Sequence, residues 1–185
     1  MSFLPDDLQA EQAKWRAFPR QRPANIVRPG PGQESVWDYP RPPRVEAVAK
    51  RLRVEFGGMV LANTIKGLRV LETSSPPVYY FPPEDVVVTS LVQTSHSTFC
   101  EWKGVAHYWS IQILDRVASQ CAWSYPDPTS GFEIIQNYVA FYPSLMDACY
   151  VDDDVATSQT GDFYGGWITP EITGPFKGDP GTEAW

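Results

Sequence analysis

Residues 52–63 read LRVEFGGMVLAN, and this stretch decides the class of the fold. Its apolar residues Leu52, Val54 and Phe56 alternate with charged residues, which is the period-two pattern of a half-buried β-strand. A Gly-Gly pair then separates this run from a second β-prone run, Met59–Asn63. Two such runs joined by two glycines predict a β-hairpin with a tight turn.

Short β-prone runs continue after the hairpin, separated by turn-forming residues such as Ser-Ser-Pro-Pro at 74–77 and Pro-Asp-Pro at 126–128. Many short strands with proline-rich turns indicate an all-β barrel or sandwich and argue against an alternating βαβ fold. We expect strands at Leu68–Glu72, Val78–Phe81, Val86–Thr89, Phe99–Trp102, Ala106–Leu114, Gln120–Tyr125, Val139–Tyr142 and Ala148–Val151, and one or two helical turns at Phe132–Asn137.

The composition divides the chain into three parts. Residues 1–44 form a Pro- and Arg-rich arm that begins with a short helix at Pro5–Phe18, residues 45–160 form the β core domain, and residues 161–185 form an aromatic, Gly- and Pro-rich tail packed on the core. Trp37 and Tyr39 would be costly to leave in water, so we expect the arm to dock on the body.

The composition also indicates the cell compartment of the protein and the kinds of partner that it is expected to bind. Three widely spaced cysteines fit reduced thiols better than a disulfide framework, which predicts a cytoplasmic protein. No run approaches the roughly 18 apolar residues that span a bilayer. The net charge of −7 disfavours binding to a phosphate backbone, so neither a membrane nor a nucleic acid is expected as a partner.

The run CEWKGVAHYW at residues 100–109 places a lysine, a carboxylate, a thiol and a histidine among aromatic residues. Its Lys103 is one of only five cations after residue 53, where 16 acidic residues lie. Lys103 is therefore the best candidate for a site residue. It could bind an anionic group, form a Schiff base with a carbonyl group, or make a structural ion pair with Glu101 or Glu72.

Glu72 and three aromatic residues complete the candidate pocket. Glu72 ends a predicted strand beside two tyrosines, and such a carboxyl can act as a general acid or base if burial raises its pKa. Trp123 and Tyr125 lie two positions apart, so they share one face of a strand. With Tyr108 on an adjacent strand, the three rings would form one wall of a pocket, although aromatic residues in such a pattern also build ordinary cores.

Two histidines and two cysteines, His96, Cys100, His107 and Cys121, invite a metal-site hypothesis. Their spacing contains no close pair, and residues four apart on a strand lie about 13 Å apart, too far to share an ion. We therefore predict no metal site and no cofactor. A nucleophilic or redox role for Cys100, with His96 or His107 as the base, is a separate alternative that requires a lowered thiol pKa.

Short motifs of the body occur in one order: Phe56-Gly57-Gly58, Leu61-Ala62-Asn63-Thr64, Arg69-Val70-Leu71-Glu72, Val78-Tyr79-Tyr80-Phe81-Pro82, Glu84-Asp85-Val86, Thr98 with Cys100, Lys103-Gly104, Tyr108-Trp109, Trp123-Ser124-Tyr125-Pro126-Asp127-Pro128 and Ala140-Phe141-Tyr142-Pro143. Together they resemble the bacterial family catalogued as domain of unknown function 427 (DUF427) and labelled nucleotidyltransferase-like. The resemblance covers about Val45 to Tyr150, so the arm and the tail lie outside it.

The resemblance implies a compact Mss4-like fold, a twisted β-tent of short sheets. The chain departs from the family at Asn63, where an aspartate is usual, and an amide cannot act as a base. Nucleotidyl transfer needs paired carboxylates that hold Mg²⁺ and a glycine-rich phosphate cradle, and neither is visible in the sequence. The recurring polar positions of the family correspond here to Glu72, Tyr80, Asp85, Cys100, Lys103, Tyr108, Trp123 and Tyr125.

Our first hypothesis is a β domain that binds a small molecule, as a binding protein or as an enzyme. Lys103 would hold an anionic or carbonyl group and Glu72 would transfer a proton, so these two carry the catalytic role. We expect them within about 4 Å of each other, or in one cavity bridged by water. The residues that we expect to bind the ligand are Tyr80, Cys100, Tyr108, Trp123 and Tyr125.

The second hypothesis is a protein-interaction or regulatory module. The basic arm and the aromatic tail would then be the working surfaces, and they would bind a protein partner or a second copy of the chain. Exposed Trp37, Trp167 and Trp185 would form the binding patch.

Overall fold

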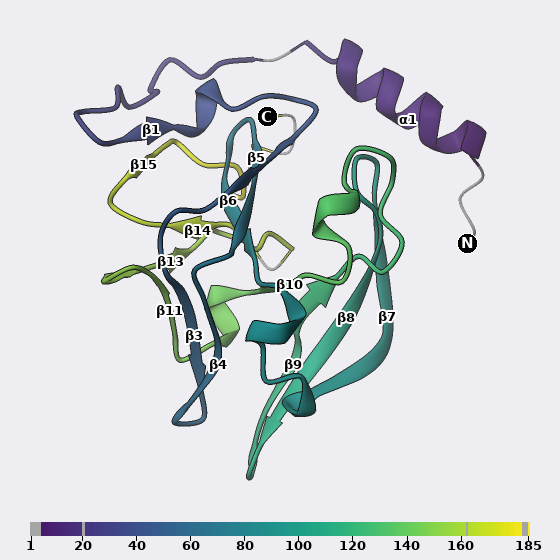
Figure 1. Ribbon diagram of the computed structural model, residues 1–185. Coiled ribbons are helices and arrows are strands. Elements are labelled where there is room, and N and C mark those ends of the chain that lie inside the picture. Colours follow the sequence, from purple (N-terminus) through teal and green to yellow (C-terminus); the bar gives the residue numbers. More distant parts are fainter. Residues whose placement is uncertain (1–4, 20, 162, 183–184) are drawn as a thin grey trace.

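The structure is a computed structural model that describes residues 5–19, 21–161, 163–182 and 185. Strands account for 44% of it and helices for 14%, which confirms the predicted mainly β single domain (Figure 1). Its one α-helix is α1 (Pro5–Ala17), and the 3₁₀ helices are η1 (Val36–Asp38), η2 (Pro83–Asp85), η3 (Val88–Ser90), η4 (Glu133–Ile135) and η5 (Pro143–Leu145).

The strands are short except for three in the middle of the chain. In chain order they are β1 (Glu34–Ser35), β2 (Arg44–Ala47), β3 (Leu52–Phe56), β4 (Met59–Thr64), β5 (Leu68–Glu72), β6 (Ser75–Tyr80), β7 (Leu91–Cys100), β8 (Gly104–Ile113), β9 (Arg116–Ser124), β10 (Val139–Phe141), β11 (Ala148–Val151), β12 (Asp154–Val155), β13 (Thr157–Ser158), β14 (Trp167–Ile168) and β15 (Ile172–Thr173).

The predicted hairpin is confirmed as β3–β4, the centre of a four-stranded sheet with the order β12-β11-β3-β4. Val54 lies opposite Ala62 in this antiparallel pair. Gly57 and Gly58 form the turn with φ of +62° and +77°, a region that glycine enters without the steric penalty of a Cβ. The alternating sequence therefore sets both the strands and their reversal.

A second four-stranded sheet, with the order β10-β9-β8-β7, contains the three long strands, and a three-stranded sheet has the order β2-β5-β6. Phe81, just after β6, exchanges backbone hydrogen bonds of 2.8 and 2.9 Å with Val139 of β10, which joins these two sheets. The described strands form several antiparallel sheets and no barrel. The largest apolar cluster includes the fully buried side chains of Leu52, Ile111 and Phe141, each worth about 1.5–3 kcal/mol of burial free energy.

Two of the predicted strands are wrong. Val86–Thr89 forms no strand; Val87 instead donates a backbone hydrogen bond to Leu61, and η3 follows. Phe99–Trp102 is not a separate strand, because β7 begins at Leu91 and ends at Cys100. The polar segment 92–98 has no apolar alternation, which is why sequence patterning missed most of β7.

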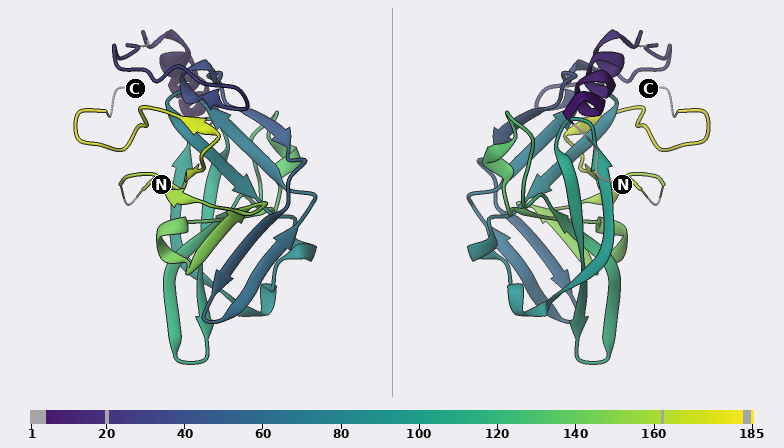
Figure 2. Two further views of the ribbon diagram at one scale, coloured as in Figure 1. Left: turned by 90° about the vertical axis from the view of Figure 1, so that its left-hand side faces the viewer. Right: turned by 90° about the vertical axis from the view of Figure 1, so that its right-hand side faces the viewer.

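The arm and the tail lie together at one end of the molecule, and the β8–β9 hairpin projects at the other (Figures 1 and 2). β1 of the arm pairs in parallel with β15 of the tail. Trp37 is 3% exposed, as expected for a docked arm, and Trp167 is fully buried. The ring of Trp185 packs edge-on against Trp37, with ring centroids 5.2 Å apart. The predicted patch of three exposed tryptophans is therefore wrong, because these rings are packed against the protein.

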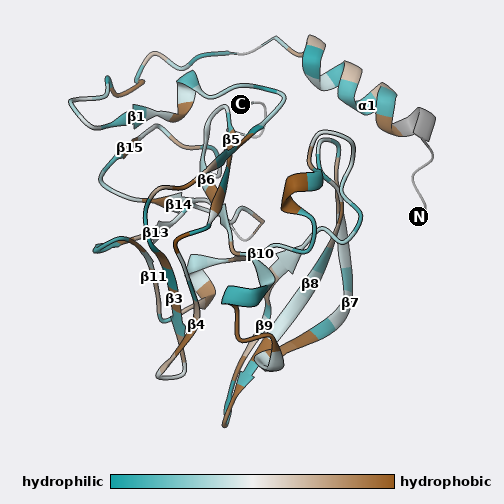
Figure 3. Ribbon diagram, in the orientation of Figure 1, coloured by the Kyte–Doolittle hydropathy of each residue, from teal (hydrophilic) through white to brown (hydrophobic). Residues whose placement is uncertain are grey.

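The helix α1 has few apolar residues and is mostly teal or pale in Figure 3, whereas the strands around the core carry brown segments. Its contacts with the body include those of Gln12, Trp15 and Arg16, whose guanidinium lies 5.8 Å from the ring centroid of Trp102. Gln12 donates a hydrogen bond of 2.8 Å to the carbonyl oxygen of Glu101, and Trp15 packs against the apolar cluster that contains Tyr80. No helix in the part of the chain that the structure describes could cross a membrane.

Candidate functional site

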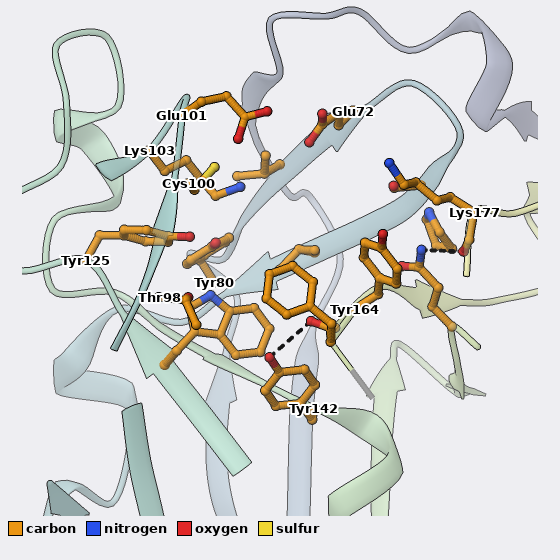
Figure 4. Close-up of a pocket in the computed structure, with 18 of the residues that line it drawn as sticks. Glu72, Tyr80, Thr98, Cys100, Glu101, Lys103, Tyr125, Tyr142, Tyr164 and Lys177 are labelled. Atoms are coloured by element: carbon orange, nitrogen blue, oxygen red, sulfur yellow. Dashed lines mark hydrogen bonds between the residues drawn. The ribbon is translucent and has the colours of Figure 1, made fainter. Parts of the chain in front are cut away.

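A cavity of about 350 Å³ lies where β5, β6, the β7–β8 turn and β9 meet the tail and the arm (Figure 4). This volume falls in the range of small-molecule sites, about 300–1,000 Å³. The family resemblance and the strand patterns predicted seven site residues, and the structure brings all of them into the cavity wall: Glu72, Tyr80, Cys100, Lys103, Tyr108, Trp123 and Tyr125.

The β7–β8 turn carries two charged residues of the site, Glu101 and Lys103, on either side of the buried Trp102. The chain reverses here because Gly104 has φ of +97°, which disfavours any residue with a Cβ. Thr129 fixes the turn from the far side, since its backbone N–H donates 3.1 Å to the carbonyl oxygen of Lys103 and its hydroxyl donates to that of Trp102. These two hydrogen bonds fix the backbone of the turn that carries Glu101 and Lys103.

Lys103 is one of the three cations in the cavity wall. It is half-buried, and its ammonium lies 5.8 Å from the ring centroid of Tyr125. Burial by itself lowers the pKa of Lys103, but the neighbouring acidic groups, above all Cys100 and Tyr125, outweigh burial and raise that pKa well above its usual value. The carboxylate of Glu72 is also among the groups that raise this pKa, and it favours the ammonium form of the side chain at neutral pH. The Lys103 ammonium makes no hydrogen bond or ion pair with any residue that the structure describes.

Uncharged donors surround this ammonium. Burial raises the pKa of Tyr80 and Tyr125, so both phenols stay protonated at neutral pH. Tyr80 is fully buried, and its hydroxyl has no hydrogen-bond partner among the described residues. The charge of Lys103 and the nearby indole of Trp123 lower the pKa of Tyr80 but do not outweigh burial, and the indole does not reach the hydroxyl in the geometry of a hydrogen bond. An unsatisfied buried hydroxyl is destabilising unless a ligand or water bonds to it.

Cys100 also lies beside Lys103, and Figure 4 shows the sulfur close to the lysine side chain. Burial nevertheless raises the pKa of the Cys100 thiol. A cysteine nucleophile needs a lowered thiol pKa. The direction of the shift is therefore opposite to the one that the cysteine-enzyme hypothesis requires.

Glu72 and Lys103 both line the cavity, but they do not form the direct ion pair that was one alternative of our prediction. The Oε1 of Glu72 lies 3.2 Å from the Nε of Arg41, which comes from the arm. The side chain of Arg41 is only 5% exposed, so this pair is largely enclosed. Glu72 therefore already has a cationic partner, and the charge of Lys103 remains available.

Glu101 is a charged residue of the cavity that we did not predict as a site residue. Burial and the nearby carboxylate of Glu72 raise the pKa of Glu101 above its usual value. Its carboxyl forms no hydrogen bond or ion pair with the rest of the described chain. The sequence showed that Glu101 lies two positions from Lys103. It gave no reason to predict Glu101 as a site residue, because a glutamate in a turn is usually exposed to solvent.

Another part of the wall is aromatic and includes the tail. Tyr108 lies directly across from Trp123 in the β8–β9 pair, which confirms that their strands are adjacent. Trp123 packs against Tyr142 in a tilted arrangement, with ring centroids 4.6 Å apart. Gly165 of the tail lies so near that a Cβ there would come within 2.2 Å of the Trp123 ring. Tyr142 donates a hydrogen bond of 3.2 Å to the carbonyl oxygen of Phe163, which holds the tail at the mouth of the cavity.

Other candidate residues lie outside the cavity. The amide oxygen of Asn63 accepts a hydrogen bond from Arg51 on the surface, and Asp85 accepts one of 2.6 Å from Thr64. Both have local structural contacts. Among the described residues, no group of three or more His, Cys, Asp or Glu side chains could hold a metal ion.

Comparison with known protein families matches residues 44–152 to the family described as a domain of unknown function, DUF427. A comparison with curated proteins gives no match. The matched segment is more than half of the chain and contains all seven predicted site residues, whereas Arg41 and the tail residues of the cavity lie outside it. The chain belongs to the DUF427 family.

Proposed function

We propose that the protein binds an anionic small molecule in this cavity, with Lys103 as the group that holds the anion. The observation that carries the proposal is the ammonium of Lys103, half-buried and without an anionic partner among the described residues. A charge removed from water in this way is unfavourable unless an opposite charge joins it. The unpaired Tyr80 hydroxyl adds an uncharged donor near Lys103.

The balance of charges in the wall supports an anionic ligand. The charged residues that line the cavity are three cations, Arg41, Lys103 and Lys177, and two carboxylates, Glu72 and Glu101. The wall therefore carries a net positive charge in a protein whose total is −7. The balance is small, which favours a monoanion such as a carboxylate over a doubly charged phosphate.

The protonation state of Lys103 also distinguishes between two roles that the sequence left open, anion binding and Schiff-base formation. A Schiff base needs a neutral amine, and enzymes obtain it by lowering the pKa of a buried lysine. Here the pKa of Lys103 is raised. Anion binding is therefore the better-supported role.

The test is thermal unfolding with benzoate as the probe anion at millimolar concentration. Benzoate should raise the melting temperature of the wild type and of Lys66→Met, which removes an exposed charge, but not that of Lys103→Met. Stabilisation of Lys103→Met equal to that of the wild type, or none in the wild type, would refute the proposal. If Lys103→Met does not fold, Lys103→Arg should keep the benzoate effect because it keeps the charge.

Enzymatic proton transfer is a second candidate function, and the two carboxyls of the cavity favour it. Glu72 is held in an ion pair by Arg41, and an ion-paired carboxylate can accept a proton but has none to donate. Glu101, with its raised pKa, is the better donor. We place this activity in the cytoplasm, because Cys100, Cys121 and Cys149 are all free thiols, as expected in a reducing compartment.

A further inference from the structure

The cavity holds two charges of opposite sign that are not paired with each other. Glu101 and Lys103 extend from the two sides of one turn into the same cavity (Figure 4). Within the described residues, neither side chain makes a hydrogen bond with another residue or an ion pair of 4.0 Å or less, and the Glu101 carboxyl accepts a hydrogen bond from its own backbone N–H. Surface charges in this state are ordinary, but both of these groups are partly removed from water.

We propose that the ligand is an aromatic α-amino acid, bound with its carboxylate at Lys103 and its ammonium group at Glu101. This inference rests on the proposed function, since it keeps Lys103 as the group that holds the anion. It adds that the ligand also carries an ammonium group and an aromatic side chain.

The spacing of the two charges favours an α-amino acid. Glu101 and Lys103 are two positions apart, so their Cα atoms are separated by at most about 7 Å. The turn is fixed on one side by Gln12 and on the other by Thr129. A ligand that meets both side chains needs its own opposite charges close together, as they are when both sit on one carbon. The free hydroxyl of Tyr80 offers one more hydrogen bond to the carboxylate.

The other walls favour an aromatic side chain. Trp123 is a large, nearly buried ring in the wall. At the mouth, Phe163 packs edge-on against Tyr164 with centroids 5.5 Å apart, yet Phe163 remains 62% exposed. An aromatic group in the cavity would cover part of this apolar surface and would stack against the rings.

The test is isothermal titration of the full-length protein with three probes of matched shape. L-Phenylalanine carries both charges, 3-phenylpropanoate only the carboxylate, and 2-phenylethylamine only the amine. In the wild type, phenylalanine should bind at least about tenfold more tightly than either analogue, because each charge-assisted hydrogen bond contributes about that factor. This comparison needs no variant, so a folding defect cannot obscure it.

Variants then assign the ammonium group to Glu101. Glu101→Gln should lose about tenfold in affinity for phenylalanine and gain affinity for 3-phenylpropanoate, since a repelling carboxylate is removed. The matched control, Glu84→Gln, removes an exposed carboxylate and should change neither affinity.

Equal or tighter binding of 3-phenylpropanoate by the wild type would overturn the amino-acid inference and leave the anion site intact. Phenylalanine, tyrosine and tryptophan could all fail to bind while benzoate still stabilises the protein through Lys103. This result would also overturn the amino-acid inference and leave the anion site intact. If the effect of benzoate does not depend on Lys103, both proposals fall.

Discussion

Glu72 is paired with Arg41, its Oε1 3.2 Å from the guanidinium Nε, and is not paired with Lys103. The arm therefore supplies a charge that the β core alone would lack at this point. Because Arg41 holds Glu72, the ammonium of Lys103 is left for a ligand. This relationship links the arm to the site and leads to the first prediction.

Arg41→Met should lower the free energy of unfolding by about 1–3 kcal/mol, between the values for exposed and buried ion pairs. It should also weaken benzoate binding, because Glu72 would then be free to turn toward Lys103. Urea unfolding and titration measure the two effects. The double variant Arg41→Met/Glu72→Gln should recover part of both, and a double variant no better than the single one would contradict this explanation.

Gly165→Ala should destabilise the protein by about 1–3 kcal/mol, the usual effect of overpacking. Its Cβ would come within 2.2 Å of the rigid ring of Trp123. The control is Gly30→Ala, whose Cβ would meet only the amide oxygen of Gln33, at 3.3 Å. Thermal unfolding compares the two variants. Equal melting temperatures would mean that the tail does not pack against Trp123 as described.

Glu101→Gln should stabilise the protein at neutral pH. Burial raises the pKa of Glu101 above the unfolded value of 4.5. Ionisation in the folded state is thus unfavourable, and this loss of stability is complete above the folded pKa and absent below 4.5. The advantage of the variant should therefore shrink as the pH falls and vanish below about 4.5. An advantage that persists at pH values below this range would show that the carboxyl charge is not its cause.

The Cys100 thiol should react slowly with iodoacetamide at neutral pH. Its pKa is raised above the usual value of 9.0, so little thiolate is present. The rate of alkylation at Cys100, followed by mass spectrometry of the peptide, should rise only in strongly alkaline solution. Cys100→Ser serves as the blank. A midpoint below that of free cysteine would revive the cysteine-enzyme hypothesis.

The sequence predicted local features well and long-range packing less well. The β3–β4 hairpin follows from alternation and two glycines, both visible within twelve residues. The strand β7 was mostly missed because its side chains are polar and its pairing with β8 comes from the tertiary fold. The pairing between arm and tail joins residues about 140 apart, and no local pattern reports such a contact.

The candidate site shows the same division. Lys103 stood out because cations are rare in the body, and Trp123 and Tyr125 because of strand alternation. The role of Glu101 depends on its burial and on the lack of a partner, and the contribution of Arg41 depends on where the arm docks. These are properties of the folded chain, so the sequence could suggest the site but not its balance of charges.

The most direct test of the central claim is the crystal structure of the protein soaked with 4-bromobenzoate, located by anomalous scattering from bromine. The proposal predicts bromine in the cavity and the carboxylate within hydrogen-bonding distance, about 2.7–2.9 Å, of the ammonium of Lys103. A carboxylate bound at Lys66 or elsewhere on the surface, with Lys103 unoccupied, would contradict the claim that this cavity is an anion site.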